Sequence, residues 1–268
     1  MAAVAKEEDL IGGHYNRNDL ITIILSALRA GGKDIEALTA EDLSPLDQFH
    51  TGGKEATLRL AGRAGVNADT EVLDVGGGLG GAARLLARDF HCPVVVLDLS
   101  HEYCRAGEIL TGRTGLDGLV RFRRGNALDL PFPPESFDLV WTQHSSMNVS
   151  DKERLYSEIR RVLRPGGRLA LHEVMAGAFG PIHFPVPWAR SAAISHLRPQ
   201  AEIASLLTTL GFRKIIWNDE TEIATLARTP AGVGIHLLFE ADFDEMFQNY
   251  IRNLKEKRTA VFQGVFEL

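Results

Sequence analysis

The chain has 268 residues, of which 45% are hydrophobic and 24% are charged, and its formal net charge is −6. This composition excludes a disordered chain, and the length suits one elaborated α/β domain. No long block of basic residues occurs, so a nucleic-acid partner is disfavoured, because phosphate binding depends on clustered Lys and Arg.

The N-terminal segment Met1–Leu10 is charged and no apolar run follows it, which predicts neither a signal peptide nor a membrane anchor. The longest apolar stretch, 20–28, is too short to span a bilayer. Cys92 and Cys104 cannot by themselves form a disulfide scaffold or a zinc site. We therefore expect a cytoplasmic protein with reduced thiols, no bound metal and no membrane partner.

The N-terminal part is predicted to be helical and to precede the sheet. The expected elements are, in order, a loose tail over 1–13, an apolar helix over 19–30, a polar link over 33–45 and a second helix over about 54–64. We interpret 1–53 as a tail with a helical cap and 54–268 as the core domain.

From Glu71 onward, short apolar runs alternate with glycine turns and helical patterns. Strands are expected at 72–75, 94–97, 119–123, 137–142, 168–174, 213–217 and 261–267, with helices at 82–90, 101–110, 200–210 and 243–257. Runs such as Val72–Val75, which is apolar apart from Asp74, fit parallel strands that are covered on both faces. The pattern predicts a doubly wound, mostly parallel seven-stranded sheet.

Another helix is signalled between the fourth and fifth strands. Ser150 followed by Glu153 is typical of a capping box, and apolar residues then recur at helical spacing. Pro165 and the two glycines after it are expected to end this helix.

The alternation of strands and helices is interrupted at about 175–197, which is rich in Gly, Pro and aromatic residues. We predict an inserted lid there, because long loops in compact domains are usually functional or disordered. His183 and Trp188 in this lid are candidates to wall an apolar or cationic substrate pocket. Alternatively, Trp188 only fills the core beneath the loop.

The strongest chemical signal is Asp74–Gly80, where a buried strand passes into a helix through several glycines. Glycines at this point let the backbone approach a ligand, and ligands bind at the carboxyl ends of such strands. The segment also fits the dinucleotide fingerprint, which is a weak match alone. Asp98 ends the second strand and suits the two ribose hydroxyls, so NAD and S-adenosylmethionine both remain candidates at this point.

Three further motifs follow in order: Gly125–Asp129, Phe137–Trp141 and Arg161–Arg168. With these, the sequence resembles the class I S-adenosylmethionine-dependent methyltransferases over roughly 70–175. Within that class it resembles the branch of the quinone-biosynthesis and the glycine, sarcosine and dimethylglycine methyltransferases. The residues that carry this second resemblance are Trp141–His144, Ser150–Lys152 and Val162–Gly167, with softer matches at Gln48–His50 and Val261–Gln263.

The resemblance implies roles for the matching residues in binding S-adenosylmethionine. Gly76, Gly78 and Gly80 would pack on its methionine part, with Asp74 near the amino group and Gln143 facing the methionine end. Asp98 would hold the ribose. Leu99 would flank the adenine, and Asn126, Ala127 and Leu128 would frame the adenine edge. The alternative for Asn126 and Asp129 is an Asx turn.

Methyl transfer is an in-line displacement, so the protein must mainly hold the nucleophile close to the methyl group and exclude water. A base is needed only for an acceptor whose proton must leave early, as with a phenol or a carbon acid. The catalytic candidates are His144, which follows the fourth strand, His50 and Tyr15. The candidates for substrate binding are His144, Met147, His172, His183 and Trp188. Many members of the class have histidine where this chain has Asn148.

Four functions are weighed. The first is methyl transfer to nitrogen, oxygen or carbon of a small-molecule acceptor. The others are an S-adenosylmethionine-dependent rearrangement or cyclisation, an NAD-dependent oxidoreductase, and a non-catalytic binding module. An amino-acid acceptor would need an Arg for its carboxylate, for which Arg190 and Arg198 are candidates, whereas an apolar pocket would suit an aromatic or quinone-like acceptor. The C-terminal helix leaves a homodimer open.

Overall fold

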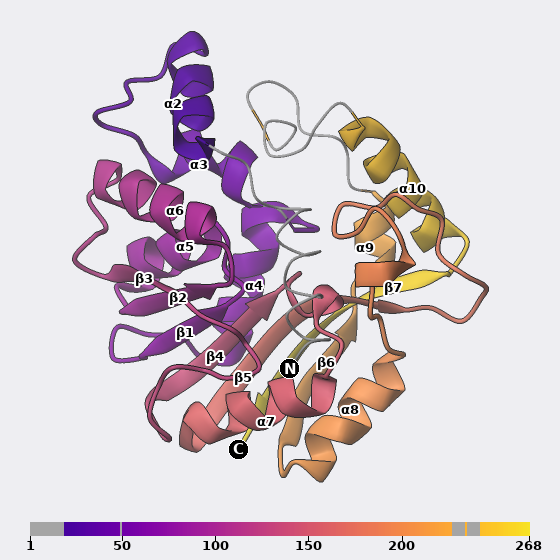
Figure 1. The fold of residues 1–268 in the computed structure, drawn as a ribbon. Coiled ribbons are helices and arrows are strands. Elements are labelled where there is room, and N and C mark those ends of the chain that lie inside the picture. Colours follow the sequence, from indigo (N-terminus) through magenta and orange to yellow (C-terminus); the bar gives the residue numbers. More distant parts are fainter. Residues whose placement is uncertain (1–18, 49, 227–233, 235–241) are drawn as a thin grey trace.

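The computed structural model describes residues 19–48, 50–226, 234 and 242–268. Its seven strands are β1 (Val72–Val75), β2 (Val94–Asp98), β3 (Val120–Arg124), β4 (Phe137–Gln143), β5 (Leu163–Ala176), β6 (Arg213–Asp219) and β7 (Thr259–Glu267). They form one sheet in the order β3-β2-β1-β4-β5-β7-β6, in which β7 runs antiparallel to both of its neighbours (Figure 1). The prediction of a mostly parallel seven-stranded sheet is confirmed.

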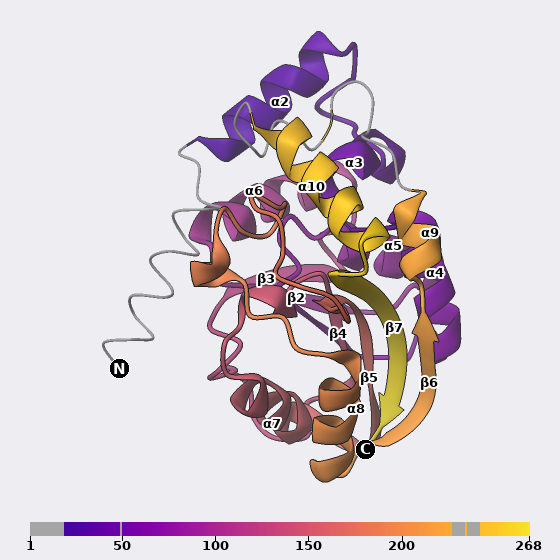
Figure 2. The same ribbon diagram turned by 90° about the vertical axis from the view of Figure 1, so that its right-hand side faces the viewer.

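Helices cover both faces of this sheet (Figure 2). They are α2 (Leu20–Ala30), α3 (Ala40–Asp47), α4 (Gly53–Ala64), α5 (Gly81–Phe90), α6 (His101–Arg113), α7 (Lys152–Val162), α8 (Gln200–Thr209), α9 (Thr221–Thr225) and α10 (Phe243–Lys255), with short 3-10 turns η1 (Ser146–Asn148) and η2 (Ala192–Ile194). No helix in the described ranges is long and apolar enough to cross a membrane.

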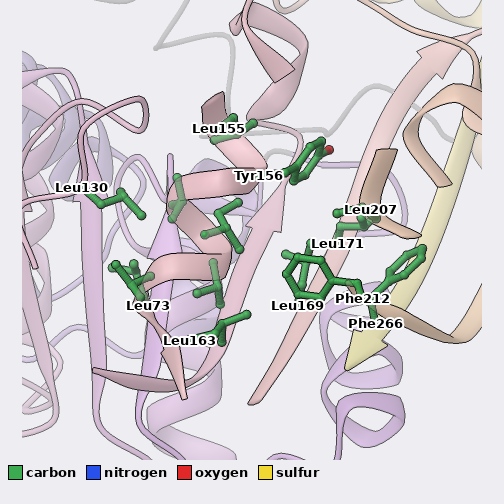
Figure 3. Close-up of a cluster of buried hydrophobic side chains, with 14 of the residues drawn as sticks. Leu73, Leu130, Leu155, Tyr156, Leu163, Leu169, Leu171, Leu207, Phe212 and Phe266 are labelled. Atoms are coloured by element: carbon green, nitrogen blue, oxygen red, sulfur yellow. The ribbon is translucent and has the colours of Figure 1, made fainter. Parts of the chain in front are cut away.

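One face of the sheet is buried under α7 and α8, and Figure 3 shows the side chains of this core. Leu155 and Tyr156 of α7 and Leu207 of α8 pack there against strand residues such as Leu171 and Phe266. The other face is buried under α4 and α5, with Trp141 of β4 at less than 1% exposure among the residues of that core. Burial on both faces explains why the central strands are almost entirely apolar.

The N-terminal helices form a separate core with helices that come later in the chain. Leucines and isoleucines of α2 and α3 pack with Tyr103 and Leu110 of α6 and with Phe243 and Met246 of α10. Arg84 of α5 and Asp47 of α3 add an ion pair of 2.6 Å in which both side chains are almost fully buried. The N-terminal helices and the start of α10 therefore share one core.

Two local expectations are wrong. Helix α3 lies in the stretch expected to be a polar link, because Thr39 and Asp42 form a capping box that the weak apolar pattern concealed. Helix α7 is capped by the Asp151 side chain, which accepts from the Arg154 N–H at 2.8 Å, and not by Ser150. The expected partner, Glu153, instead pairs with Arg198 at 2.6 Å.

The boundary between α7 and β5 also differs from the prediction. The helix ends at Val162, before Pro165, because a residue that precedes proline disfavours the helical conformation. Strand β5 then includes Pro165 and extends to Ala176. The segment expected to be a lid, about 175–197, therefore begins at 177 and not at 175.

Candidate functional site

The turn after β1 brings the backbone close to β2 and to the loop that follows β4. Gly76, Gly78 and Gly80 all have positive φ, at 72°, 56° and 80°, which favours glycine. The Gly76 N–H donates to the Leu97 carbonyl oxygen at 2.7 Å, and a Cβ on Gly76 would overlap the Cβ of Ser145. This turn is therefore fixed by close packing of the backbone, and it opens into the N-terminus of α5.

Asp74 lies under this turn at the end of β1. It is 1% exposed, and its Oδ2 atom has no hydrogen-bond partner among the described residues. Burial and, secondarily, the charge of Asp98 raise the pKa of Asp74 to about 7. A buried carboxylate without a partner is unfavourable unless a cation or a donor satisfies it. Asp74 therefore fits the ammonium group of an amino-acid ligand.

Asp98 lies at the end of β2 and is oriented by backbone amides. Its Oδ2 accepts from the Gly78 N–H at 2.9 Å and its Oδ1 from the Ser100 N–H at 2.8 Å. Burial raises its pKa, and these hydrogen bonds act against that rise. A carboxylate has about four acceptor positions, so this side chain can still accept from a pair of ribose hydroxyls. Leu99 is half-buried beside it.

The segment after β3 forms a tight turn. The Asn126 Oδ1 accepts from the Leu128 N–H at 2.8 Å, and the Asp129 N–H donates to the Asn126 carbonyl oxygen at 3.1 Å. The Asx turn considered for Asn126 is thus present. Ala127 and Leu128 are half-buried against the core below. Their contacts with the cofactor remain predictions.

Three histidines that are distant in sequence meet beside the glycine turn. His50 comes from the segment before α4, His144 follows β4, and His172 lies on β5. The centroids of the His144 and His172 rings are 5.0 Å apart, and those of His50 lie 6.2 Å and 6.0 Å from them. Burial lowers the pKa of His50 to about 4 and that of His144 to about 3, and it lowers the pKa of His172 well below its usual value. The cluster is therefore uncharged near neutral pH.

Gln143 connects this cluster. Its Nε2 lies 3.0 Å from the His50 Nδ1 and 3.2 Å from the His172 Nδ1. Its Oε1 accepts from the Trp141 Nε1 at 3.0 Å and from the Thr57 hydroxyl at 3.2 Å. All four hydrogen-bonding positions of the amide are used within the protein. The expected contact of Gln143 with the methionine end can therefore be made only by packing.

A buried carboxylate holds the loop that carries His144. Glu173 accepts from the backbone N–H groups of Ser145 and Ser146 at 3.2 and 3.3 Å, and burial raises its pKa to about 7. The Ser145 hydroxyl donates to the Val75 carbonyl oxygen at 2.9 Å. His144 itself has a φ of 51°, which is unusual for a residue other than glycine. Such a conformation persists only where the surroundings enforce it.

Aromatic residues from distant segments form a wall next to this loop. Trp188, between β5 and α8, and Tyr250 of α10 lie edge to face with centroids 5.9 Å apart. Both pack with Met147 of η1 in one buried cluster. Asn148 fixes the Trp188 segment by donating to the carbonyl oxygens of Trp188 and Ile194. Trp188 is thus a core residue of the segment over 177–199, and a contact with substrate remains a prediction.

The remaining candidates lie elsewhere. The His183 Nε2 pairs with Glu256 at 2.8 Å, and its backbone bonds to Asn253, so it belongs to the contact between 177–199 and α10. Arg190 pairs with Asp242, and Arg198 pairs with Glu153. Tyr15 lies outside the described residues.

Sequence reasoning missed Thr51, Thr57 and Tyr250. The Thr51 hydroxyl bonds to the Tyr250 hydroxyl across 199 residues of sequence. No local pattern marks these residues, because their roles depend on which segments the fold brings together.

The strand order, the glycine turn after β1 and the carboxylate after β2 together define the class I methyltransferase fold. The methyltransferase domain family matches residues 73–171 of this chain. A sarcosine/dimethylglycine N-methyltransferase of Halorhodospira halochloris is 30% identical over 78% of this chain and 74% of its own length. The chain belongs to the S-adenosylmethionine-dependent methyltransferases.

Two further proteins show the breadth of the likeness. A glycine/sarcosine/dimethylglycine N-methyltransferase of Actinopolyspora halophila is 31% identical over 72% of this chain, which spans only 34% of the length of that relative. The crystal structure of a geranyl diphosphate C-methyltransferase from Streptomyces coelicolor superimposes with a TM-score of 0.71 at 18% identity, covering 97% of each chain. That similarity concerns the fold.

Proposed function

We propose that this protein transfers the methyl group of S-adenosylmethionine to nitrogen, oxygen or carbon of a small-molecule acceptor. The observation that carries the proposal is the unpartnered, buried Asp74 carboxylate beneath the glycine turn, next to an uncharged histidine cluster. A cationic amino-acid group would satisfy the carboxylate. The uncharged histidine cluster next to it suits the acceptor.

S-adenosylmethionine supplies an activated methyl group and leaves as neutral S-adenosylhomocysteine. The chain has to bind and align the two partners, because an aligned displacement gains most of its rate from proximity. Asp74 holds the ammonium group, Asp98 holds the ribose, and the glycine turn lets the backbone pack against the methionine part. The loop over 144–146 places His144 on the acceptor side.

We also propose that the N-terminal part, predicted as a tail and helical cap over 1–53, caps the site and that the predicted lid, about 175–197, closes over it. Asn148 and Trp188 hold that segment against η1, and α10 joins it to the N-terminal helices. Exclusion of water from the sulfonium would favour its neutralisation in the reaction. We place the protein in the cytoplasm, without a nucleic-acid partner.

The test is a calorimetric titration with S-adenosylmethionine. We expect binding in roughly the micromolar range, no response to NAD, and a loss of about 1.5–3 kcal/mol in Asp98→Ala because a charged hydrogen-bond acceptor is removed. The matched control is Asp117→Ala, which removes an exposed carboxylate after α6 and should leave the affinity unchanged. Binding of NAD in place of S-adenosylmethionine would overturn the proposal.

A second candidate function is a rearrangement or cyclisation that keeps the methyl group on the cofactor. The reaction product distinguishes it from methyl transfer. Release of S-adenosylhomocysteine together with a methylated acceptor supports methyl transfer. Conversion of a substrate without S-adenosylhomocysteine supports the rearrangement.

A further inference from the structure

Two imidazole nitrogens on the acceptor side are buried and have no hydrogen-bond partner within the described part of the chain. They are the Nε2 atoms of His144 and His172. The two rings lie edge to face at the point where β4 ends beside β5. His172 is only 1% exposed. Because a buried donor or acceptor is costly when it is left unsatisfied, this pair is suited to a polar atom of a bound molecule.

Gln143 determines which nitrogen of His172 carries the proton. The Trp141 Nε1 can only donate, so the atom of Gln143 that it contacts is the carbonyl oxygen. The Gln143 Nε2 therefore donates, and the His172 Nδ1 must accept from it. A neutral His172 then carries its proton on Nε2. The unpartnered atom of His172 is a fixed hydrogen-bond donor.

Gln143 also orients His50, but both ring nitrogens of His50 have hydrogen-bond partners within the protein. Its Nδ1 accepts the second N–H of Gln143, and its Nε2 lies 3.1 Å from both the Gln48 Oε1 and the Thr57 hydroxyl. His50 therefore supports the cluster and is not available to a substrate. His144 and His172 are the two members that can bind one.

We propose that the His172 Nε2–H and the His144 Nε2 together bind the hydroxyl oxygen of an uncharged acceptor, a phenol or an enol, and that this oxygen is methylated. The inference rests on the proposed function and narrows it. The donor on His172 occupies one of the two lone pairs of the oxygen and so orients the other lone pair toward the methyl group. The lone pair of His144, in the tautomer with Nδ1 protonated, accepts the hydroxyl proton.

The same features disfavour an amino-acid acceptor. A donor fixed at this position would compete with the methyl group for the lone pair of an amine. The carboxylate of an amino acid needs a cation, and the cluster is neutral because burial lowers the pKa of each histidine. Arg190 and Arg198 already pair with Asp242 and Glu153.

In the methyl-transfer step, the acceptor oxygen forms a bond to the methyl carbon while the carbon–sulfur bond breaks. The electron pair of the broken bond stays on sulfur. The hydroxyl proton passes to the His144 Nε2 and then to solvent. The low pKa of His144 is compatible with this role, because the hydroxyl becomes far more acidic as its oxygen gains the methyl group.

The first experiment is nitrogen NMR of the histidines in the complete protein. We expect the His172 ring to be neutral, with a proton on Nε2 and none on Nδ1, across the neutral pH range. In Gln143→Glu both side-chain oxygens accept, so the proton should move to the Nδ1 of His172. A His172 with a protonated Nδ1 in the unaltered protein would overturn the assignment of its donor.

The second experiment measures S-adenosylhomocysteine release with matched acceptors: phenol against aniline, catechol against ortho-phenylenediamine, and sarcosine as an aliphatic amine. We expect turnover of the hydroxyl members only, and a loss of roughly a hundredfold in kcat/KM in Gln143→Glu because the oriented His172 donor is lost, with an unchanged circular dichroism spectrum as evidence of correct folding. Turnover of the amines, or cofactor binding without turnover of any hydroxyl member, overturns this inference alone. Failure to bind S-adenosylmethionine would instead overturn the proposed function.

Discussion

The proposed cofactor side (Asp74–Gly80 and Asp98) and the proposed acceptor side (the histidine cluster with Gln143 and the Thr51–Tyr250 pair) are built in different ways. On the cofactor side, the turn after β1 and the end of β2 act mainly through backbone amides and positive φ angles, with Asp74 and Asp98 as the principal side chains. On the acceptor side, the site is a set of side chains from segments far apart in the sequence. Gln143 contacts His50 across 93 residues, and Thr51 contacts Tyr250 across 199.

This difference implies that the two sides tolerate change differently. Where a backbone turn is in close contact with its neighbours, as at Gly76, it has no room for even one methyl group, whereas a hydrogen-bonded side-chain cluster can lose one bond and keep its packing. The cofactor side should therefore respond to small substitutions with large effects, and the acceptor side with small, separable ones.

The largest expected effect is that of Gly76→Ala. A Cβ at this position would overlap Ser145, and the residue has a φ of 72°. Strain and overpacking together should cost about 2–5 kcal/mol in free energy of unfolding and should abolish binding of S-adenosylmethionine. Urea denaturation and calorimetry measure the two effects.

Gly78→Ala is the matched control for that substitution. Its φ is also positive, at 56°, but the nearest atom to an added Cβ is 3.6 Å away, on Tyr103. Only the strain of about 1–2 kcal/mol should remain in the free energy of unfolding. Equal losses in the two variants would show that the contact with Ser145 does not matter and that the turn is less constrained than the structure indicates.

Asp74→Asn should have the next largest effect, and the size of this effect should depend on pH. The folded protein raises the pKa of Asp74 to about 7 from 3.8. The stabilising contribution of the neutral carboxyl is thus fully present below the lower value and is lost as the pH rises through about 7. Without cofactor, the variant should match the unaltered protein near pH 4 and be more stable by on the order of 4 kcal/mol near pH 8.

Adding S-adenosylmethionine near pH 8 should reverse that order, because a ligand stabilises the state that binds it and Asn cannot pair with an ammonium group. The check is urea denaturation at both pH values, with and without the cofactor. A variant that is less stable than the unaltered protein near pH 8 without cofactor would mean that Asp74 already has a partner in the free protein.

The same contrast explains which parts of the molecule could be predicted from the sequence. The turn at Asp74–Gly80 was predictable, since glycines at a strand-to-helix junction are a local signal that needs no knowledge of other segments. The alternating pattern predicted a mostly parallel, doubly wound sheet, but it did not give the order of the strands or the position of β7 between β5 and β6. Helix α3 was concealed because it has little apolar character and contains Pro45, although its capping box was visible in the sequence.

The acceptor side was only partly predictable. His144 and His172 were expected at strand ends, and parallel strands bring such ends together. The role of Gln143 was not predictable, because it depends on the Trp141 indole below it and on His50 across the site. His183, in an equally suggestive motif, pairs with Glu256 instead. A motif places a residue on a segment, and only the packing of the segments decides what it contacts.

The smallest expected effect concerns the hydrogen bond between Thr51 and Tyr250, both of which are at least nine-tenths buried. Thr51→Val and Tyr250→Phe should each lower the free energy of unfolding by about 1 kcal/mol. The double variant should lose less than the sum, because one hydroxyl is no longer left unpaired. Tyr250→Phe keeps the ring that packs on Trp188. Thr208→Val, which removes an exposed hydroxyl in α8, is the control and should change stability by less than about 0.5 kcal/mol.

The decisive measurement on the Thr51 and Tyr250 variants is their effect on binding of the acceptor and of S-adenosylmethionine. Because the pair joins α10 to the segment before α4, its loss should loosen the acceptor side and raise the KM for an acceptor. The affinity for S-adenosylmethionine should change by less than about twofold, because sites that share no contacts behave additively. If the affinity for the cofactor fell as much as that for the acceptor, the two sides would be energetically coupled, and the division between a backbone-built and a side-chain-built half would have to be abandoned.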